Sequence, residues 1–100
     1  MRYGYVKGKS EGVIEKQLNF LKQYNLDEIV IEKSGNDLEA LLNKLQSGDE
    51  LYVEQIERLT RSLSKMVEIS ETIRKKGAIL YMNGKTVELF TRLYKSFINM

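Results

Sequence analysis

Two patterns of apolar residues alternate along the whole chain. Short runs rich in β-branched and aromatic residues, each bounded by turn-forming residues, are typical of β-strands. Longer stretches in which apolar residues recur three and four positions apart predict amphipathic helices. The expected strands cover residues 2–6, 28–31, 50–53 and 78–82, and the expected helices cover 13–24, 38–45, 63–73 and 87–98.

The residues between these segments predict where the helices begin and end. Asp37 is expected to N-cap the second helix, and Ser62 or Ser64 the third, because short oxygen-bearing side chains accept from the first free N–H groups of a helix. Gly77 is expected to end the third helix, since glycine adopts the left-handed conformation found at many helix C-termini. Asn83 and Gly84 form a turn signal after the fourth strand.

Strand and helix alternate four times, which predicts a single α/β domain over residues 1–100. Such an order favours a mostly parallel four-stranded sheet with helices on both faces, a three-layer αβα arrangement. In parallel sheets, ligands bind beyond the carboxyl ends of the strands. That rule selects the loops at residues 7–12, 32–37 and 55–62.

The composition removes several kinds of chemistry. Histidine and cysteine are absent, so an imidazole base, a thiol nucleophile and a zinc–thiolate site are excluded. The acidic residues are dispersed without the spacing of a calcium or magnesium loop, and we expect neither a metal nor a cofactor. The net charge of +2 permits a basic patch without requiring a polyanionic partner. No apolar run approaches a membrane span or a signal peptide, so we expect a cytoplasmic protein without membrane contact.

Cations and a hydroxyl group gather on two of the selected loops. Lys7, Lys9 and Ser10 lie on the first, and Arg58 and Arg61 on the third. A guanidinium binds phosphate through two parallel hydrogen bonds and stays charged at any relevant pH. A hydroxyl beside fixed cations is a plausible nucleophile toward a phosphodiester. The alternative is that the two arginines are ordinary surface cations that form salt bridges with Glu54 or Glu57.

Several short motifs, taken together and in order, resemble one protein family. They are Gly4–Ser10 (GYVKGKS), Gln17 with Leu21, Glu32–Gly35 (EKSG), Gly48-Asp49, Glu57–Ser62 (ERLTRS) and Lys76-Gly77. Their order and spacing are similar to the catalytic domain of the serine recombinases, the resolvase/invertase family. The resemblance covers nearly the whole chain.

The resemblance implies a flavodoxin-like sheet and a role in site-specific DNA recombination, the chemistry by which mobile elements integrate. In the family, a serine attacks a DNA phosphodiester, forms a 5′-phosphoserine link and frees a 3′-hydroxyl, while arginines hold the phosphate and subunits exchange strands in a tetramer. Ser10 would then be the nucleophile, and Arg58 and Arg61 would bind the scissile phosphate. The carried-over phosphate-binding or DNA-binding positions are Lys7, Lys9, Gln17, Glu32 and Glu57.

The chain also departs from the family pattern. Alignment from Gly4 puts Lys9 at the nucleophile position, and Ser10 fits only if the loop holds one extra residue. Lys7 stands where the family has arginine, and Asn36-Asp37 replaces a family Asp-Arg-Pro. We expect no helix-turn-helix domain after residues 87–98, and therefore weak or non-specific DNA binding by this chain alone.

These departures leave a second function open. The chain could be a non-catalytic relative that acts as an interaction or regulatory module, as a homo-oligomer or by co-assembly with an intact recombinase. A response-regulator-like signalling domain is a more remote third reading. The acidic cluster that such a domain carries after its first strand is absent, because Lys7, Lys9 and Ser10 occupy that loop.

Overall fold

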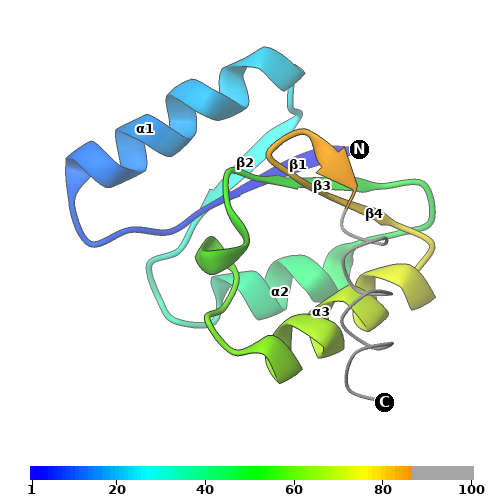
Figure 1. Ribbon diagram of the computed structural model, residues 1–100. Helices are drawn as coiled ribbons and strands as arrows, with labels where there is room; N and C mark the ends of the chain where they lie inside the picture. Colours follow the sequence, from blue (N-terminus) through cyan, green and yellow to red (C-terminus); the bar gives the residue numbers. More distant parts are fainter. Residues whose placement is uncertain (87–100) are drawn as a thin grey trace.

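The computed structural model of the chain describes residues 1–86. Strands and helices alternate through this part, as the apolar pattern predicts (Figure 1). The strands are β1 (Arg2–Val6), β2 (Glu28–Ile31), β3 (Glu50–Val53), β4 (Ile79–Met82) and β5 (Lys85–Thr86), and the helices are α1 (Glu11–Leu21), α2 (Asp37–Lys44) and α3 (Leu63–Lys75). Two single 3-10 turns, Lys22–Tyr24 and Ile56–Arg58, follow α1 and β3. The expected helix at residues 87–98 lies outside the described residues.

The strands form one sheet in the order β2-β1-β3-β4-β5. The first four are parallel to one another, and this confirms the predicted α/β, flavodoxin-like fold. The fifth strand was not predicted, because its two residues are too few and too polar to form an apolar run. Asn83 and Gly84 both have positive φ, as a two-residue hairpin turn requires, and they bring β5 antiparallel to β4.

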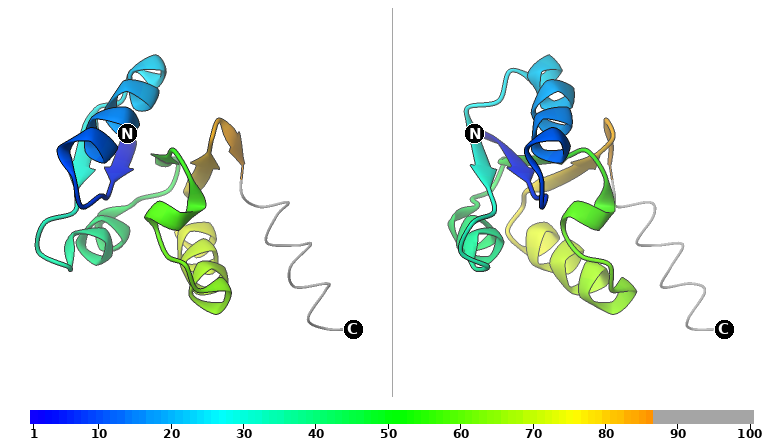
Figure 2. Two further views of the ribbon diagram at one scale, coloured as in Figure 1. Left: turned by 60° about the vertical axis from the view of Figure 1, so that its left-hand side comes forward. Right: turned by 90° about the vertical axis from the view of Figure 1, so that its left-hand side faces the viewer.

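Helices cover both faces of the sheet. Figure 1 shows α1 on one side and α2 with α3 on the other, and the turned views of Figure 2 show the same separation. The larger core lies between the sheet and the α2/α3 layer, where Leu51, Leu41 and Ile73 are buried. A smaller core around Val6 and Leu21 lies under α1. Within residues 1–86, no helix combines the length and the apolar character needed to cross a bilayer.

The predicted capping residues are confirmed at α3 but not at α2, and α1 covers Glu11–Leu21 instead of the expected 13–24 because Lys22–Tyr24 forms a 3-10 turn. Ser62 N-caps α3 by accepting from the Lys65 N–H at 3.3 Å, so Ser62 rather than Ser64 holds that position. The prediction that Asp37 N-caps α2 is wrong, because Asn36 is the N-cap and Asp37 is the first helical residue. Asp37 instead turns its carboxylate back to the loop that precedes the helix. Gly77 has a φ of +75° just after α3, as expected.

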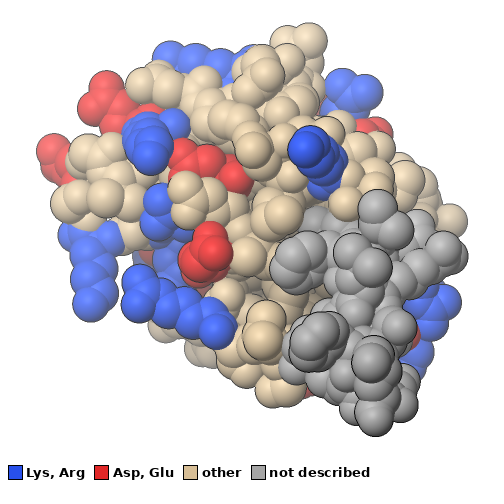
Figure 3. All heavy atoms as spheres, in the orientation of Figure 1, with Lys and Arg blue, Asp and Glu red and all other residues tan. Residues whose placement is uncertain are grey.

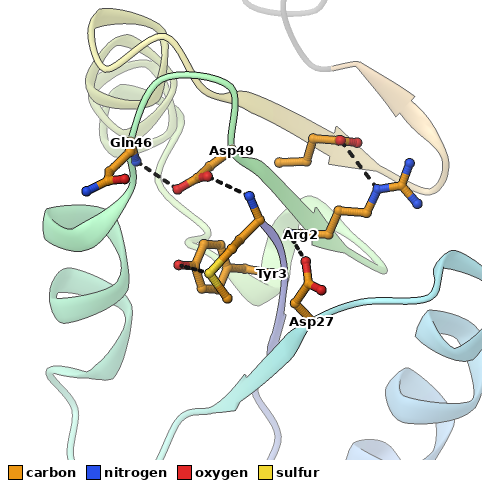
Figure 4. Close-up of polar contacts among 7 residues, drawn as sticks. Arg2, Tyr3, Asp27, Gln46 and Asp49 are labelled. Atoms are coloured by element: carbon orange, nitrogen blue, oxygen red, sulfur yellow. Dashed lines mark hydrogen bonds and ion pairs between the residues drawn. The ribbon is translucent and has the colours of Figure 1, made fainter.

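The amino edge of the sheet is held by polar contacts around the start of β1 (Figure 4). The carboxylate of Asp49, which is largely buried, accepts from the Met1 ammonium and from the Gln46 N–H, each at 2.8 Å. The hydrogen bond from the ammonium is the main cause that lowers the pKa of Asp49. The Arg2 N–H donates to Asp27 at 2.7 Å. These contacts fix β1 at the edge opposite the loops that the sequence selected.

Candidate active site

Three loops meet at the carboxyl edge of the sheet. Because β1 lies between β2 and β3 and all three are parallel, the segments that follow them leave the sheet on the same side. These segments are residues 7–10, 32–36 and 54–62. Figure 3 shows lysine and arginine side chains gathered on this side of the molecule, with a few acidic side chains among them. The sheet therefore brings the candidate site residues of these loops to one edge.

Ser10 stands at the junction between the first loop and α1. It is the N-cap residue of α1, and its Oγ accepts a hydrogen bond from the Val13 N–H at 3.3 Å. The residue is exposed, so the hydroxyl lies at the surface and at the positive end of the helix dipole. This end of a helix favours negative charge, whether on a phosphate or on an oxygen that is losing its proton. Lys9 is also exposed, in the bend just before Ser10.

Gln17, on α1, holds the loop that follows β1. Its side chain is completely buried, and its amide oxygen accepts from the Lys7 N–H at 3.0 Å. The amide nitrogen donates to the Lys7 carbonyl at 2.8 Å and to the Val13 carbonyl at 3.0 Å. The backbone of Lys7 is therefore pinned to α1, while its side chain remains exposed. These contacts show that Gln17, predicted as a phosphate-site residue, stabilises the loop after β1.

Glu32 organises the second loop in a similar way. One carboxylate oxygen accepts from the Tyr5 hydroxyl at 2.7 Å and from the Leu38 N–H at 3.1 Å. The other accepts from the N–H groups of Gly35 and Asp37, both at 3.0 Å. Burial, followed by the hydrogen bond to Glu32, raises the pKa of Tyr5, which keeps the phenol protonated as a donor. The carboxylate thus ties β1, the loop and the start of α2 together.

Replacing Asp37 by asparagine is expected to make the stability of the protein less sensitive to acid. The N–H groups of Ser34 and Lys33 donate to the Asp37 carboxylate at 2.8 and 2.6 Å and lower the pKa of Asp37 to about 2. Because this pKa is lower in the folded chain, the stabilisation is present above an unfolded pKa of about 4 and is lost as the pH falls toward 2. Urea unfolding midpoints should therefore fall less steeply with acidity in D37N.

Glu39→Gln is the matched control for this experiment. Glu39 is an exposed acid in the same first turn of α2. Its removal should leave the slope of stability against pH close to that of the wild type. Equal slopes for D37N and the wild type between about pH 4 and pH 2 would contradict the assignment of this acid sensitivity to Asp37.

The two arginines of the third loop differ in their surroundings. Arg58 is partly buried, and its Nη2 donates to Glu54 Oε1 at 3.1 Å. Glu54 directly follows β3 and is itself buried. Arg61 and Glu57 are exposed. Of the two acids left open as salt-bridge partners, the structure selects Glu54 for Arg58.

Sequence reasoning placed these residues at one edge but missed what several of them contact. The partners of Gln17 and Glu32 lie 10 and 27 positions away in the chain, at Lys7 and Tyr5. One feature of the sequence could have indicated the contacts of Gln17. It occupies a position on the apolar face of α1, and a buried amide needs hydrogen-bond partners inside the protein. In the described part of the chain, no three acidic side chains gather as a metal site would require.

Comparison with known proteins gives this edge its context. Residues 7–98 match the sequence profile of the family described as "Resolvase, N terminal domain". The chain belongs to this family. A curated relative named Resolvase, from Clostridium perfringens (strain 13 / Type A), is 32% identical over 87 residues, which cover 78% of this chain and 46% of the relative. The chain thus spans about half the length of the curated relative that it matches.

Membership of the resolvase family confirms the resemblance drawn from the sequence motifs. The matched region includes the loops after β1, β2 and β3 and all the candidate site residues. The family therefore supports a recombinase-type catalytic domain.

Proposed function

We propose that this chain is a serine-recombinase catalytic domain that cleaves and rejoins DNA strands through a phosphoserine–DNA link. In the cleavage step, a bond forms between Ser10 Oγ and phosphorus while the bond from phosphorus to the 3′ oxygen breaks. The 3′ oxygen leaves as a hydroxyl, and the phosphate remains attached to Ser10. Rejoining is the reverse attack by a 3′-hydroxyl, which releases the serine.

The cations of the carboxyl edge act on the phosphate. Arg58 and Arg61 hold the scissile group and offset the charge that builds on its oxygens during the transfer. Lys7 and Lys9 attract the DNA backbone as point charges. Gln17 acts from α1 through its hydrogen bonds to the backbone of Lys7. Glu32 and Glu57 act through the loops to which they belong, since carboxylates repel a phosphate.

The observation that carries this proposal is the position of Ser10. An exposed hydroxyl caps α1 on the loop after β1, and the loop with Arg58 and Arg61 follows the neighbouring parallel strand β3. A phosphate near the α1 N-terminus would meet free backbone dipoles on one side and guanidinium groups on the other. The resolvase family match supports the same reading.

Ser10→Ala is expected to abolish a covalent protein–DNA adduct that the wild type forms. A suicide DNA duplex, nicked so that the cleaved strand diffuses away, should trap the phosphoserine link when an intact recombinase of the family is also present. Denaturing gels and mass spectrometry of the adduct would identify the linked residue. Removing Arg61 should slow adduct formation by a factor on the order of 10² to 10³.

Ser62→Ala is the matched control, because Ser62 caps α3 through the same 3.3 Å geometry. Both substitutions remove a cap and should cost about 1 kcal/mol of stability. S10A should lose the adduct, and S62A should keep it. A link through Lys9, or an adduct that persists in S10A, would reject Ser10 as the nucleophile.

The ion pair between Arg58 and Glu54 favours a second function. The guanidinium of Arg58 is bound to a buried carboxylate and is therefore not free to bind a phosphate. A catalytically degenerate relative could tolerate this loss, because it does not need to hold a scissile phosphate. In this reading, the chain is an interaction or regulatory module that forms homo-oligomers or co-assembles with an intact recombinase. The wild type would then form no adduct but would co-sediment with that recombinase. We expect a cytoplasmic location and weak or non-specific DNA contact in either case.

A further inference from the structure

The contact between Arg58 and Glu54 is the only ion pair at the carboxyl edge among the described residues in which both partners are shielded from water. The side chain of Glu54 is 8% exposed, and that of Arg58 is 22% exposed. The other ion pairs of the described residues include at least one side chain that is 46% exposed or more. The pair is therefore held more firmly than a typical surface salt bridge.

One edge of the Arg58 guanidinium is not presented for a two-pronged phosphate contact. Nη2 is bound to Glu54, and Nε is buried with no hydrogen-bond partner among the described residues. These two nitrogens form one of the edges through which arginine binds phosphate bidentately. A buried donor without a partner is unfavourable. A movement of the guanidinium that gives Nε a hydrogen-bond partner would therefore be stabilising.

Glu54 is placed where it can hold the arginine. It directly follows β3, whose last residue Val53 is 1% exposed, so the strand positions the carboxylate rigidly. Arg58 lies one turn later, in the 3-10 turn that follows the strand. A fixed anion beside a movable cation competes with any anion that arrives from solvent.

We propose that Glu54 is an internal competitor of phosphate that holds Arg58 away from the DNA backbone. Binding of DNA requires Arg58 to exchange the carboxylate for a phosphate, which restricts the site to ligands that supply other contacts as well. This inference rests on the proposed function, because Arg58 is one of the arginines proposed there to bind the scissile phosphate.

Glu54→Gln tests the proposal first without DNA. Phenylglyoxal modifies accessible arginines, and peptide mapping by mass spectrometry reports each residue separately. In the wild type, Arg58 should react much more slowly than the exposed Arg61. In E54Q, Arg58 should react several-fold faster while Arg61 is unchanged. An unchanged rate at Arg58, in protein whose circular dichroism is that of the wild type, would overturn the proposal.

The second measurement is DNA affinity as a function of salt. E54Q should bind a short duplex about 10-fold more tightly than the wild type. The slope of log affinity against log salt should become steeper by about 0.9, the value of one added phosphate contact. Glu11→Gln is the matched control, because it removes the same charge from an exposed residue at the same edge without contacting Arg58. A gain no larger than that of E11Q would contradict the competition.

The double variant E54Q/R58Q guards against a folding artefact. It replaces the ion pair by two neutral amides, which leaves no unpaired buried charge. The gain in DNA affinity seen for E54Q should disappear in this variant, since the gain requires Arg58. Retention of the gain would overturn the proposal. If neither the wild type nor E54Q binds DNA, the proposed function fails, and the reactivity of Arg58 still decides whether Glu54 holds it.

Discussion

Replacing Gln17 by leucine is expected to destabilise the domain by roughly 2–4 kcal/mol. The amide of Gln17 makes three hydrogen bonds from a fully buried position, two to the backbone of Lys7 and one to the Val13 carbonyl. Leucine fills a similar volume but leaves the polar groups of Lys7 without their partner. Urea unfolding followed by circular dichroism would measure the change in the free energy of unfolding.

Gln23→Leu serves as the comparison. Gln23 is exposed, and among the described residues its amide donates only to the Phe20 carbonyl one turn earlier. Its replacement should change the free energy of unfolding by less than about 0.5 kcal/mol. Q17L should also loosen the loop that carries Ser10, which faster amide exchange at Lys7 would report. Equal stabilities for the two variants would show that the buried amide does not hold the loop.

Replacing Glu32 by glutamine is expected to cost about 3 kcal/mol of stability. The carboxylate accepts four hydrogen bonds, from the Tyr5 hydroxyl and from three backbone N–H groups at the start of α2. Glutamine has one acceptor oxygen, and its NH₂ group would face N–H donors where the second oxygen now lies. The loss combines missing hydrogen bonds with a repulsive contact.

Two further variants separate the parts of this effect. Tyr5→Phe removes one of the four hydrogen bonds and should cost about 1.5 kcal/mol, roughly half of the loss in E32Q. Glu15→Gln changes an exposed acid on α1 and should be nearly neutral. Thermal and urea unfolding of all three would rank them. A cost for E32Q no larger than that for Y5F would mean that the backbone bonds of the second loop contribute little.

The sequence predicted Gln17 and Glu32 as phosphate-site positions. The structure shows why the internal contacts of these two side chains could not be foreseen. Each contact joins residues from different elements, such as α1 to the loop after β1, or β2 to β1. A sequence pattern reports which residues share one helix or strand. The polar partner of a residue depends instead on how those elements pack.

The strands were predicted more closely than the polar contacts. The bounds of β1, β2 and β3 are those expected from the apolar runs, because short β-branched and aromatic segments between turn residues have few alternatives. The parallel order followed from the strand–helix alternation. The two-residue β5 escaped prediction because its pairing depends on the conformation of the preceding turn. Asp37 was misassigned because its carboxylate satisfies the loop behind it rather than the helix ahead.

The sequence by itself determined the α/β fold, the resolvase-family relationship and the edge of the sheet at which Ser10, Arg58 and Arg61 gather. These features follow from local spacing and from the order of elements along the chain. Only the tertiary structure decided the partner of Arg58. Two acids near it in the sequence were equally plausible, but β3 buries Glu54 while Glu57 remains in water. A buried carboxylate needs a cation far more than an exposed one does, and burial is a property of the packed molecule.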